Sequence, residues 1–368
     1  MIVAQGMMRV RGLTAIALTA LLACSSGGRA PAAVNDTLAE SGRPARLLSE
    51  WGLFADLKTL TPADGVVPYH LATPLFTDYA LKYRLVYVPE GLAARYDPKE
   101  AFAFPVGSIL VKTFAYAPDL RHPDDGVRPI ETRLLVHSAR GWRAFAYVWR
   151  ADLTDAELKL AGATIPVSFT APDGRMRHIR YQVPNMNQCK ACHVLGREIT
   201  PIGPKARNLN VAHDYGDGVV ENQLVHWTRL GILEGAPADP DAAPRVPAFD
   251  DRRAPLAARA RAYLDVNCGH CHRPEGPAST SGLFLTWDQP VGPNLGIMKR
   301  PTAAGRGAGS LLYDIVPGRP DESILLYRME STDPGVMMPE LGRTIVHEEG
   351  VALIRAWIAS LDEEGGGR

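Results

Sequence analysis

Residues 46–184 contain repeated short runs of hydrophobic side chains, which predict β-strands. Four segments are rich in aromatic and β-branched residues, are close to Gly or Pro residues, and have the length of ordinary strands. They are residues 81–89, 108–116, 129–137 and 142–150. Several short strands in succession favour a β-sandwich or a β-barrel. We therefore expect an N-terminal all-β domain that is sandwich- or barrel-like.

The last part of this region, residues 164–184, predicts a β-hairpin. Pro172, Asp173 and Gly174 form its turn, because Pro fixes φ and Gly accepts a positive φ. In the second strand, Ile179, Tyr181 and Val183 alternate with polar residues, as in a strand with one buried face.

After residue 184 the pattern changes to loops and helices, which indicates an α+β chain of several domains. Residues 185–236 form a middle segment, and residues 237–254, rich in Pro, Asp and Ala, predict a linker. Residues 255–366 predict an all-α domain. Two helical faces support it: one contains Leu256, Ala260, Tyr263 and Leu264, and the other contains Val351, Ile354, Trp357, Ile358 and Leu361.

The first residues indicate an export signal. Arg9 and Arg11 precede an apolar run of about 11 residues, which is shorter than a helix needs to span a bilayer. The run ends in "LLAC", which resembles the lipobox of bacterial lipoproteins, so residues 1–23 are expected to be a lipoprotein signal peptide. The resemblance implies that Cys24 is lipidated, with residues 24–45 as a tether. Cleavage near residues 30–32, without lipidation, is the alternative.

The chain has 368 residues, with 46% hydrophobic and 22% charged side chains, which is ordinary globular composition. Its 40 basic and 40 acidic side chains balance, which argues against a dedicated nucleic-acid-binding protein. Only five cysteines are present, and four of them lie in two short clusters.

Both clusters have the pattern Cys-x-x-Cys-His, "QCKACH" and "NCGHCH". This pattern is the attachment site of a c-type haem. Thiols three residues apart reach two vinyl groups of one porphyrin, and the next imidazole binds the iron. Cys189, Cys192 and His193 would hold one haem c, and Cys268, Cys271 and His272 a second.

Three other uses of these cysteines stay open. A zinc site made from both pairs would contain an unusually long intervening segment and would not use the histidines. A thioredoxin-like redox pair expects a βαβ context. Two disulfides are compatible with export, although a three-residue step is short for a structural bridge.

Each haem iron has a second axial position. For the C-terminal haem we predict Met338, in "DPGVMMPELGR", because a residue before Pro is held in extended geometry and suits a loop ligand. Met337 is the alternative, and Met329 is expected in the core. For the first haem His213 is the preferred candidate. The alternatives are His226, His178, Met176 and Met298, whereas Met186 is too close to Cys189 to reach the opposite face easily. The sixth position of this iron is also open to being vacant.

Several phrases resemble a little-characterised family of secreted bacterial dihaem c-type cytochromes. They cover most of the mature chain and include "PYHLATPLFTDYALKYR", "PNMNQCKACH", "PIGPKARNLN", "RAYLDVNCGHCH" and "PGRPDESILLYRM". The C-terminal part also resembles single-haem cytochrome c domains, in which the residue matching Met338 is an iron ligand. The resemblance implies electron transfer and a cytochrome c-like C-terminal domain.

We therefore expect an electron carrier with two covalent haem c groups, working between extracytoplasmic redox partners. The expected location is the periplasm or the cell surface, with a lipid anchor in the outer membrane. The alternative is a dihaem oxidoreductase of the peroxidase type with an open coordination site at the first haem. The β-rich domain offers aromatic residues that we expect mainly in its core, and a docking surface for a partner is the alternative. These residues are Trp51, Tyr69, Tyr83, Tyr87, Trp142, Tyr147 and Trp149.

Overall fold

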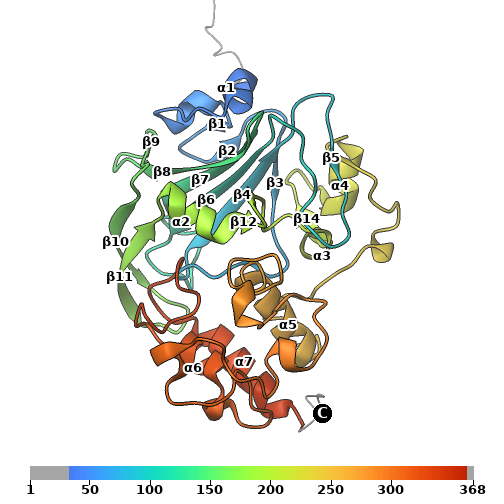
Figure 1. Cartoon of the computed structure of the whole chain (residues 1–368). Coiled ribbons are helices and arrows are strands. Elements are labelled where there is room, and N and C mark those ends of the chain that lie inside the picture. The colour runs from blue at the N-terminus through green and yellow to red at the C-terminus, as the bar shows by residue number, and fades with distance from the viewer. Residues whose placement is uncertain (1–32, 363–368) are drawn as a thin grey trace, which may run out of the picture. The chain divides into compact units, whose positions relative to one another are not determined.

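The computed structural model describes residues 33–362, and it is built around a six-stranded antiparallel sheet (Figure 1). In sheet order the strands are β3 (Val66–Tyr69), β4 (Leu81–Tyr87), β6 (Ile109–Tyr116), β7 (Arg128–Ser138), β8 (Gly141–Trp149) and β9 (Ala156–Leu158). The four strands predicted from the hydrophobic pattern are therefore confirmed. The expected signal peptide and the lipidation site Cys24 lie outside the described residues.

One face of this sheet is covered by the N-terminal segment. The segment carries α1 (Asp36–Ser41), β1 (Phe54–Asp56) and β2 (Thr61–Pro62). Its Trp51 is fully buried against the sheet, and the indole Nε1 donates a hydrogen bond of 2.7 Å to the Tyr147 hydroxyl. Side chains that alternate along β6, such as Ile109 and Val111, point to this face, as the period-two geometry of a strand requires.

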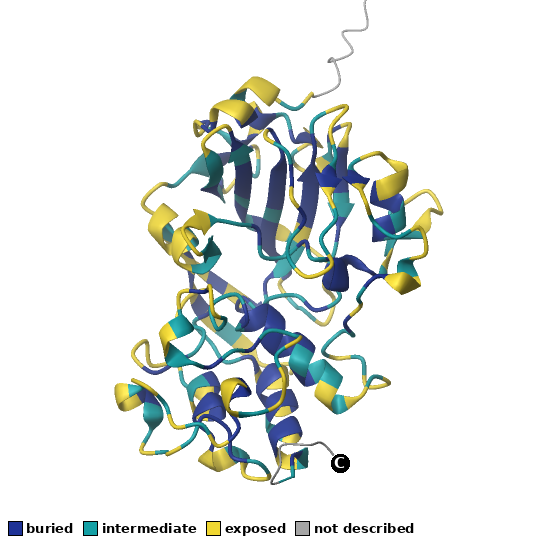
Figure 2. Cartoon of the chain, turned by 45° about the vertical axis from the view of Figure 1, so that its right-hand side comes forward, coloured by how far each residue is buried: buried dark blue, intermediate teal, exposed yellow. Residues whose placement is uncertain are grey.

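The opposite face of the sheet is covered only toward its two ends. At one end it packs against α3 (Ala206–Leu209) and α4 (Gln223–Arg229). At the other end it packs against the hairpin of β10 (Ala163–Thr170) and β11 (Met176–Val183). The hairpin prediction is confirmed, and Ile179, Tyr181 and Val183 are buried as expected. Figure 2 shows the buried central strands in dark blue.

No strand pairing joins β9 back to β3 within residues 33–362, so this sheet is open. The elements that face it are short ones rather than a second sheet of similar size. The remaining paired strands are β5 (Ala94–Arg95) with β16 (Leu233–Glu234), β12 (Val194–Leu195) with β13 (Glu198–Ile199), and β14 (Ala212–Asp214) with β15 (Val220–Asn222). The region is thus β-rich, and its small strand pairs extend into the middle segment.

Most of the aromatic residues considered for a docking surface belong to the core. Tyr83 is exposed at 41% and Trp142 is half-buried, whereas the others are buried, as their packing into the sheet faces requires. The buried ones are Trp51, Tyr69, Tyr87, Tyr147 and Trp149.

The C-terminal region contains three short helices around a core of its own. They are α5 (Leu256–Asn267), α6 (Ile324–Glu330) and α7 (Glu348–Ser360). The expectation of an all-α domain is not supported, because long irregular stretches with 3-10 turns separate these helices. The reason lies in the Gly- and Pro-rich sequence between residues 273 and 323, which disfavours longer helices. The fold class is therefore mixed, with helices, strands and a multi-stranded sheet.

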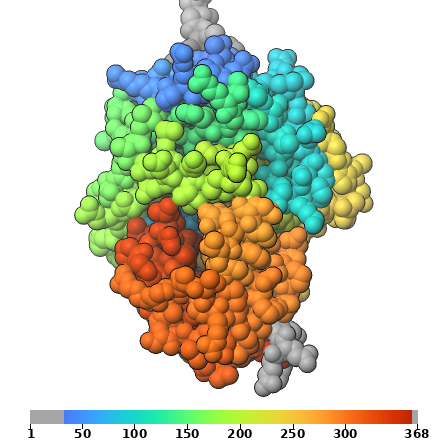
Figure 3. Space-filling model, in the orientation of Figure 1, coloured from blue at the N-terminus to red at the C-terminus, as the bar shows by residue number. Residues whose placement is uncertain are grey.

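A buried ion pair joins the middle segment to the C-terminal region. Asp265 on α5 accepts hydrogen bonds of 2.9 Å from Nε and from Nη2 of Arg207 on α3, and both side chains are less than a tenth exposed. A second link is the 2.8 Å hydrogen bond from the backbone N–H of Phe76 to Asn267 Oδ1. In Figure 3 the yellow-green segment around α2 (Met186–His193) lies directly against the orange and red C-terminal segments.

No helix in residues 33–362 has the length and apolar character needed to cross a membrane.

Replacing Asp265 by Ala should strongly destabilise the fold, because it leaves the Arg207 guanidinium buried without its counter-charge. The expected loss is about 3–5 kcal/mol of unfolding free energy, measured by urea denaturation. Asp241→Ala is the matched control: its pair with Arg245 is 78% exposed at the carboxylate, so the loss should stay below about 1 kcal/mol. Equal unfolding midpoints for the two variants would contradict the importance given to the buried pair.

Candidate functional site

The two Cys-x-x-Cys-His segments open into one large cavity. Its volume is about 920 Å³, toward the upper end of the range of small-molecule sites, about 300–1,000 Å³. Both cysteine pairs and both following histidines line it, together with Met338. The cavity lies between the half-covered face of the sheet and the C-terminal helices. The motifs are separated by many residues in sequence but share one site.

The first motif lies on α2. The helix begins with a capping box, in which Asn185 Oδ1 accepts from the Gln188 N–H and Gln188 Oε1 accepts from the Asn185 N–H. At the other end, His193 Nδ1 is 2.8 Å from the carbonyl oxygen of Thr200. A carbonyl only accepts, so Nδ1 carries the hydrogen and Nε2 keeps its lone pair. Burial lowers the pKa of His193 to about 4, so the imidazole is neutral at pH 7.

The second motif begins where α5 ends. Cys268 caps the helix, and its N–H donates to the Leu264 carbonyl at 2.9 Å. His272 repeats the pattern of His193: Nδ1 faces the Leu283 carbonyl at 3.3 Å and the Ser281 hydroxyl at 3.4 Å. Burial lowers its pKa to about 4 as well. Both histidines therefore have one nitrogen fixed by the backbone and the other free to bind a metal, as second-shell contacts arrange in metalloproteins.

Gly269, inside the second motif, is required by close packing. A Cβ at this position would lie 2.8 Å from the Asp265 carbonyl oxygen and 3.0 Å from that of Leu285. Any side chain here would push the motif away from the end of α5, and this explains the Gly of "NCGHCH".

The two motifs touch each other inside the cavity. The Cys192 thiol lies near Cys271, and this neighbour lowers the pKa of Cys192. His270 lies beside them, and its buried Nδ1 has no hydrogen-bond partner among the described residues. A backbone hydrogen bond also joins the segments that follow the two motifs, in which the Gly196 N–H donates to the Glu275 carbonyl at 2.9 Å. The two cysteine pairs therefore lie close together in the fold although they are far apart in the sequence, which the motifs alone do not reveal.

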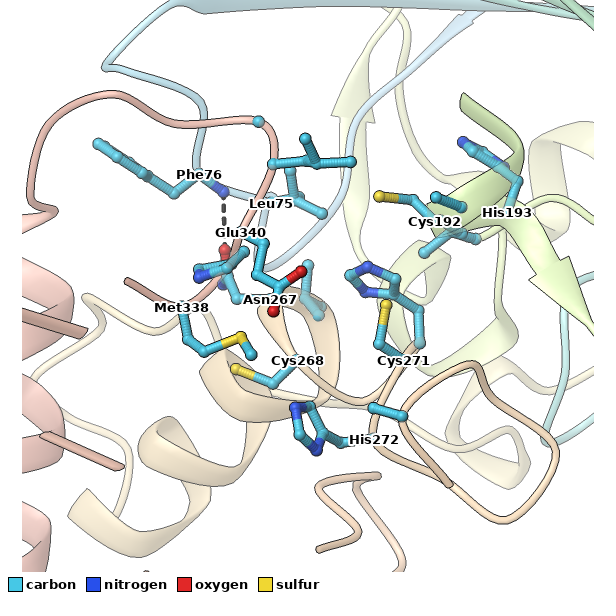
Figure 4. Close-up of a pocket in the computed structure, with 18 of the residues that line it drawn as sticks. Leu75, Phe76, Cys192, His193, Asn267, Cys268, Cys271, His272, Met338 and Glu340 are labelled. Atoms are coloured by element: carbon cyan, nitrogen blue, oxygen red, sulfur yellow. Dashed lines mark hydrogen bonds between the residues drawn. The ribbon is translucent and has the colours of Figure 1, made fainter. Parts of the chain in front are cut away.

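The structure distinguishes Met338 from its neighbour. Met338 lines the cavity, whereas Met337 is buried and is not among the residues that line it. Met329 packs in the C-terminal core, as expected, and also reaches the cavity wall. Arg343 holds the Met338 loop by donating through Nη2 to the Met338 carbonyl at 2.9 Å and to the Ser331 carbonyl at 2.8 Å. Figure 4 shows Met338, Cys268 and His272 in the same part of the cavity.

The structure does not bring His213 together with His193. His213 lies on β14, where its Nδ1 is 2.9 Å from His70 Nδ1, and it does not line the cavity. The other sixth-ligand candidates lie elsewhere too. His226 is stacked on Tyr215 and His178 is bonded to Ser168, while Met176, Met186 and Met298 are exposed.

Three charged residues of the cavity wall were not recognised in the sequence: Arg84, Lys112 and Arg133. Lys112 is the only basic residue of β6, whereas Arg84 shares β4 with Lys82 and Arg133 shares β7 with Arg128. The interruption of the hydrophobic pattern was visible, but their shared position depends on the strand register.

The donor set is of the kind that covalent haem attachment uses. All four described cysteines are free and half-buried. Within residues 33–362 no three His, Cys, Asp or Glu side chains are grouped closely enough to hold a metal ion by themselves. Two thiol pairs beside two neutral, oriented imidazoles in a largely apolar cavity match what a porphyrin needs. Comparisons with family models, with curated proteins and with solved structures found no match to this chain.

An ionic cluster beside the second motif should make stability depend on pH. Glu100 accepts from Arg273 at 2.7 and 2.9 Å and lies 3.4 Å from Lys205. Burial alone would raise the pKa of Glu100, but Arg273 and Lys205 lower it to about 2. Because the folded pKa is depressed, the stabilisation is complete above about pH 4.5 and is lost as the pH falls toward 2.

Glu100→Gln should therefore reduce the unfolding free energy at pH 7 and matter less at pH 3. The carboxylate is 39% exposed, so the loss at pH 7 should be about 1 kcal/mol or less. Urea denaturation at the two pH values measures it, with the exposed Glu322→Gln as the control. An unchanged difference between wild type and Glu100→Gln at both pH values would refute this role.

Proposed function

We propose that the protein is an exported dihaem c-type cytochrome that transfers electrons between extracytoplasmic redox partners. The observation that carries this proposal is the meeting of two Cys-x-x-Cys-His segments in one cavity. Each segment has its histidine fixed through Nδ1 by a backbone carbonyl. This is the orientation in which an imidazole offers Nε2 to an iron.

The residues have distinct tasks in this function. Haem supplies a reversible one-electron iron couple when bound. Cys189 and Cys192 would hold one porphyrin through thioether bonds, and Cys268 and Cys271 the other. Nε2 of His193 and of His272 would be the proximal ligands, and the Met338 sulfur would be the distal ligand of the second iron.

The C-terminal region supports a cytochrome c-like arrangement, although its helices are short. The second motif follows α5 directly, and Met338 lies on the loop between α6 and α7. α5, α6 and α7 pack on one apolar core. Together with the family resemblance, this order favours a small haem domain closed by its last helix. Export through the signal peptide, and a lipid anchor at Cys24, belong to the same proposal.

A dihaem oxidoreductase of the peroxidase type is the second candidate. The observation that favours it is the position of His213 outside the cavity, which removes the sixth ligand expected for the first iron. An open iron position is what such an enzyme requires. The absorption spectrum of the oxidised protein separates the two functions: two low-spin haems support the carrier, and one high-spin haem supports the oxidoreductase.

The protein produced in a host that matures c-type cytochromes should carry two covalent haems. A pyridine haemochrome assay with intact-mass spectrometry measures the number. Replacing both Cys189 and Cys192 by Ala should remove one haem, and the same change at Cys268 and Cys271 should remove the other. Cys24→Ser is the control, because it should lose only the lipid. A wild-type protein without covalent haem, or with four alkylatable motif thiols, would refute the proposal.

Met338→Leu should remove the sulfur ligand of the second iron while leaving both haems attached. The expected result is loss of the weak red absorption band that thioether ligation gives to ferric haem. The reduction potential of one haem should also fall, because thioether ligation raises it. Met337→Leu, next to it and outside the cavity lining, should keep the band. Loss of the band in Met337→Leu instead would reverse the assignment.

A further inference from the structure

A row of three cations crosses the middle of the main sheet. The register places Arg84 on β4 directly opposite Lys112 on β6, and Lys112 directly opposite Arg133 on β7. Directly opposed side chains of neighbouring strands are about 5 Å apart at Cβ. All three residues line the cavity. Like charges in this position destabilise a sheet, so the row needs a compensating partner.

The protein itself compensates only part of this charge. Glu131 forms a bidentate ion pair with Arg133, accepting from Nε at 2.6 Å and from Nη2 at 2.8 Å. The same carboxylate also accepts from the Tyr181 hydroxyl. Arg84 is 8% exposed, and its Nη2 has no partner among the described residues. Lys112 has its Nζ 4.8 Å from the centre of the Phe114 ring, and no acceptor in residues 33–362 is bonded to it.

Neighbouring charges on the same face do not change this balance. Lys82, on β4, is a further basic residue, and its Nζ donates a hydrogen bond to the Ala80 carbonyl. Burial lowers the pKa of Lys82, and the charge of Asp78 acts in the opposite direction. Burial, and next the charge of Arg84, lower the pKa of Lys112 well below its ordinary value. Lys205 and Arg273, across the cavity, are already paired with Glu100. Arg84 and Lys112 are therefore the two basic side chains of this wall that are not paired with a carboxylate.

The row lies next to an apolar surface and next to the first motif. One step along the strands, Val86, Leu110 and Leu135 form the adjacent apolar row, and Cys189 packs against the same cluster. Burial raises the pKa of Cys189, and the charge of Arg133 acts in the opposite direction. Burial lowers the pKa of His193, and the charge of Lys112 also lowers it. A ligand held at the first motif thus meets an apolar wall beside a strip of positive charge.

We propose that Arg84 and Lys112 bind the two carboxylates of the porphyrin attached at Cys189 and Cys192. This inference rests on the proposed function. The apolar row contacts the macrocycle, and the cations pair with the propionate groups at its edge, where charge-assisted hydrogen bonds are strong. A small oxyanion from solution would bind Arg84 and Lys112 by the same chemistry as a porphyrin carboxylate. Such a free anion is therefore the competing ligand.

Resonance Raman spectra of the haem-loaded full chain test the pairing through the propionate-bending band. Arg84→Gln and Lys112→Gln should each shift this band. Each should also lower the equilibrium constant for reduction of one haem about tenfold, which is about 59 mV for one electron. Removing a nearby positive charge favours the ferric form, which explains the direction. Arg84→Lys keeps the charge and should restore most of the potential.

Arg180→Gln is the matched control, because Arg180 is an exposed strand residue outside the cavity. It should leave the band and both potentials unchanged. Lys112 is only half-buried, so its variant decides the outcome if Arg84→Gln does not fold by circular dichroism. An unshifted band in the folded Gln variants would overturn the proposal.

A titration of the loaded protein with inorganic phosphate tests the competing ligand. We expect no binding that depends on Arg84, because the site is occupied by the porphyrin carboxylates. Phosphate binding that disappears in Arg84→Gln would assign the row to a free anion and overturn the proposal. A wild-type chain without haem in the mass spectrum would instead refute the proposed function, so the two failures are distinguishable.

Discussion

The buried ion pair between Arg207 and Asp265 holds the two halves of the site in register. Asp265 lies on the last turn of α5, three residues before Cys268, and also accepts from the Trp287 N–H at 3.0 Å. Arg207 belongs to α3, which packs on the sheet beside the first motif, and it also donates to the Lys99 carbonyl. An ion pair this deeply buried is stable only with both partners in place. It therefore fixes where the second motif begins relative to the sheet.

This constraint gives the β-rich region a role in the site itself. One sheet face packs against the N-terminal segment, and the other is covered at its ends by α3, α4 and the β10–β11 hairpin. The middle of that second face forms a wall of the cavity. An open face with apolar and cationic rows suits a large, flat ligand that is apolar in its plane and anionic at one edge. Under the proposed function, the sheet is a scaffold for the first haem rather than a separate binding module.

Much of this architecture follows from the sequence because the decisive patterns are local. The strand periodicity, the Pro172–Gly174 turn and the helical face around Tyr263 each lie within one element, and the structure confirms them. The two cysteine motifs are local as well. The contact between Cys192 and Cys271 depends on chain topology, which no short pattern encodes.

The differences between the sequence-based expectations and the structure also have physical causes. The charged row was missed because Arg84, Lys112 and Arg133 become neighbours only through the register of three strands. His213 was chosen by its distance along the chain, but the β14–β15 pairing turns it toward His70 and away from the cavity. The C-terminal region was expected to be all-α from two apolar faces, and the long Gly- and Pro-rich segment between them forms irregular structure instead.

Under the proposed function, two haems share one cavity. Electron paramagnetic resonance of the fully oxidised protein probes this arrangement, because ferric irons bound in one cavity interact magnetically. The spectrum should differ from the sum of the two single-haem variants, in which one pair of motif cysteines is replaced by Ala. A spectrum equal to that sum, from a protein that carries both haems, would place the irons far apart and rule out a shared cavity.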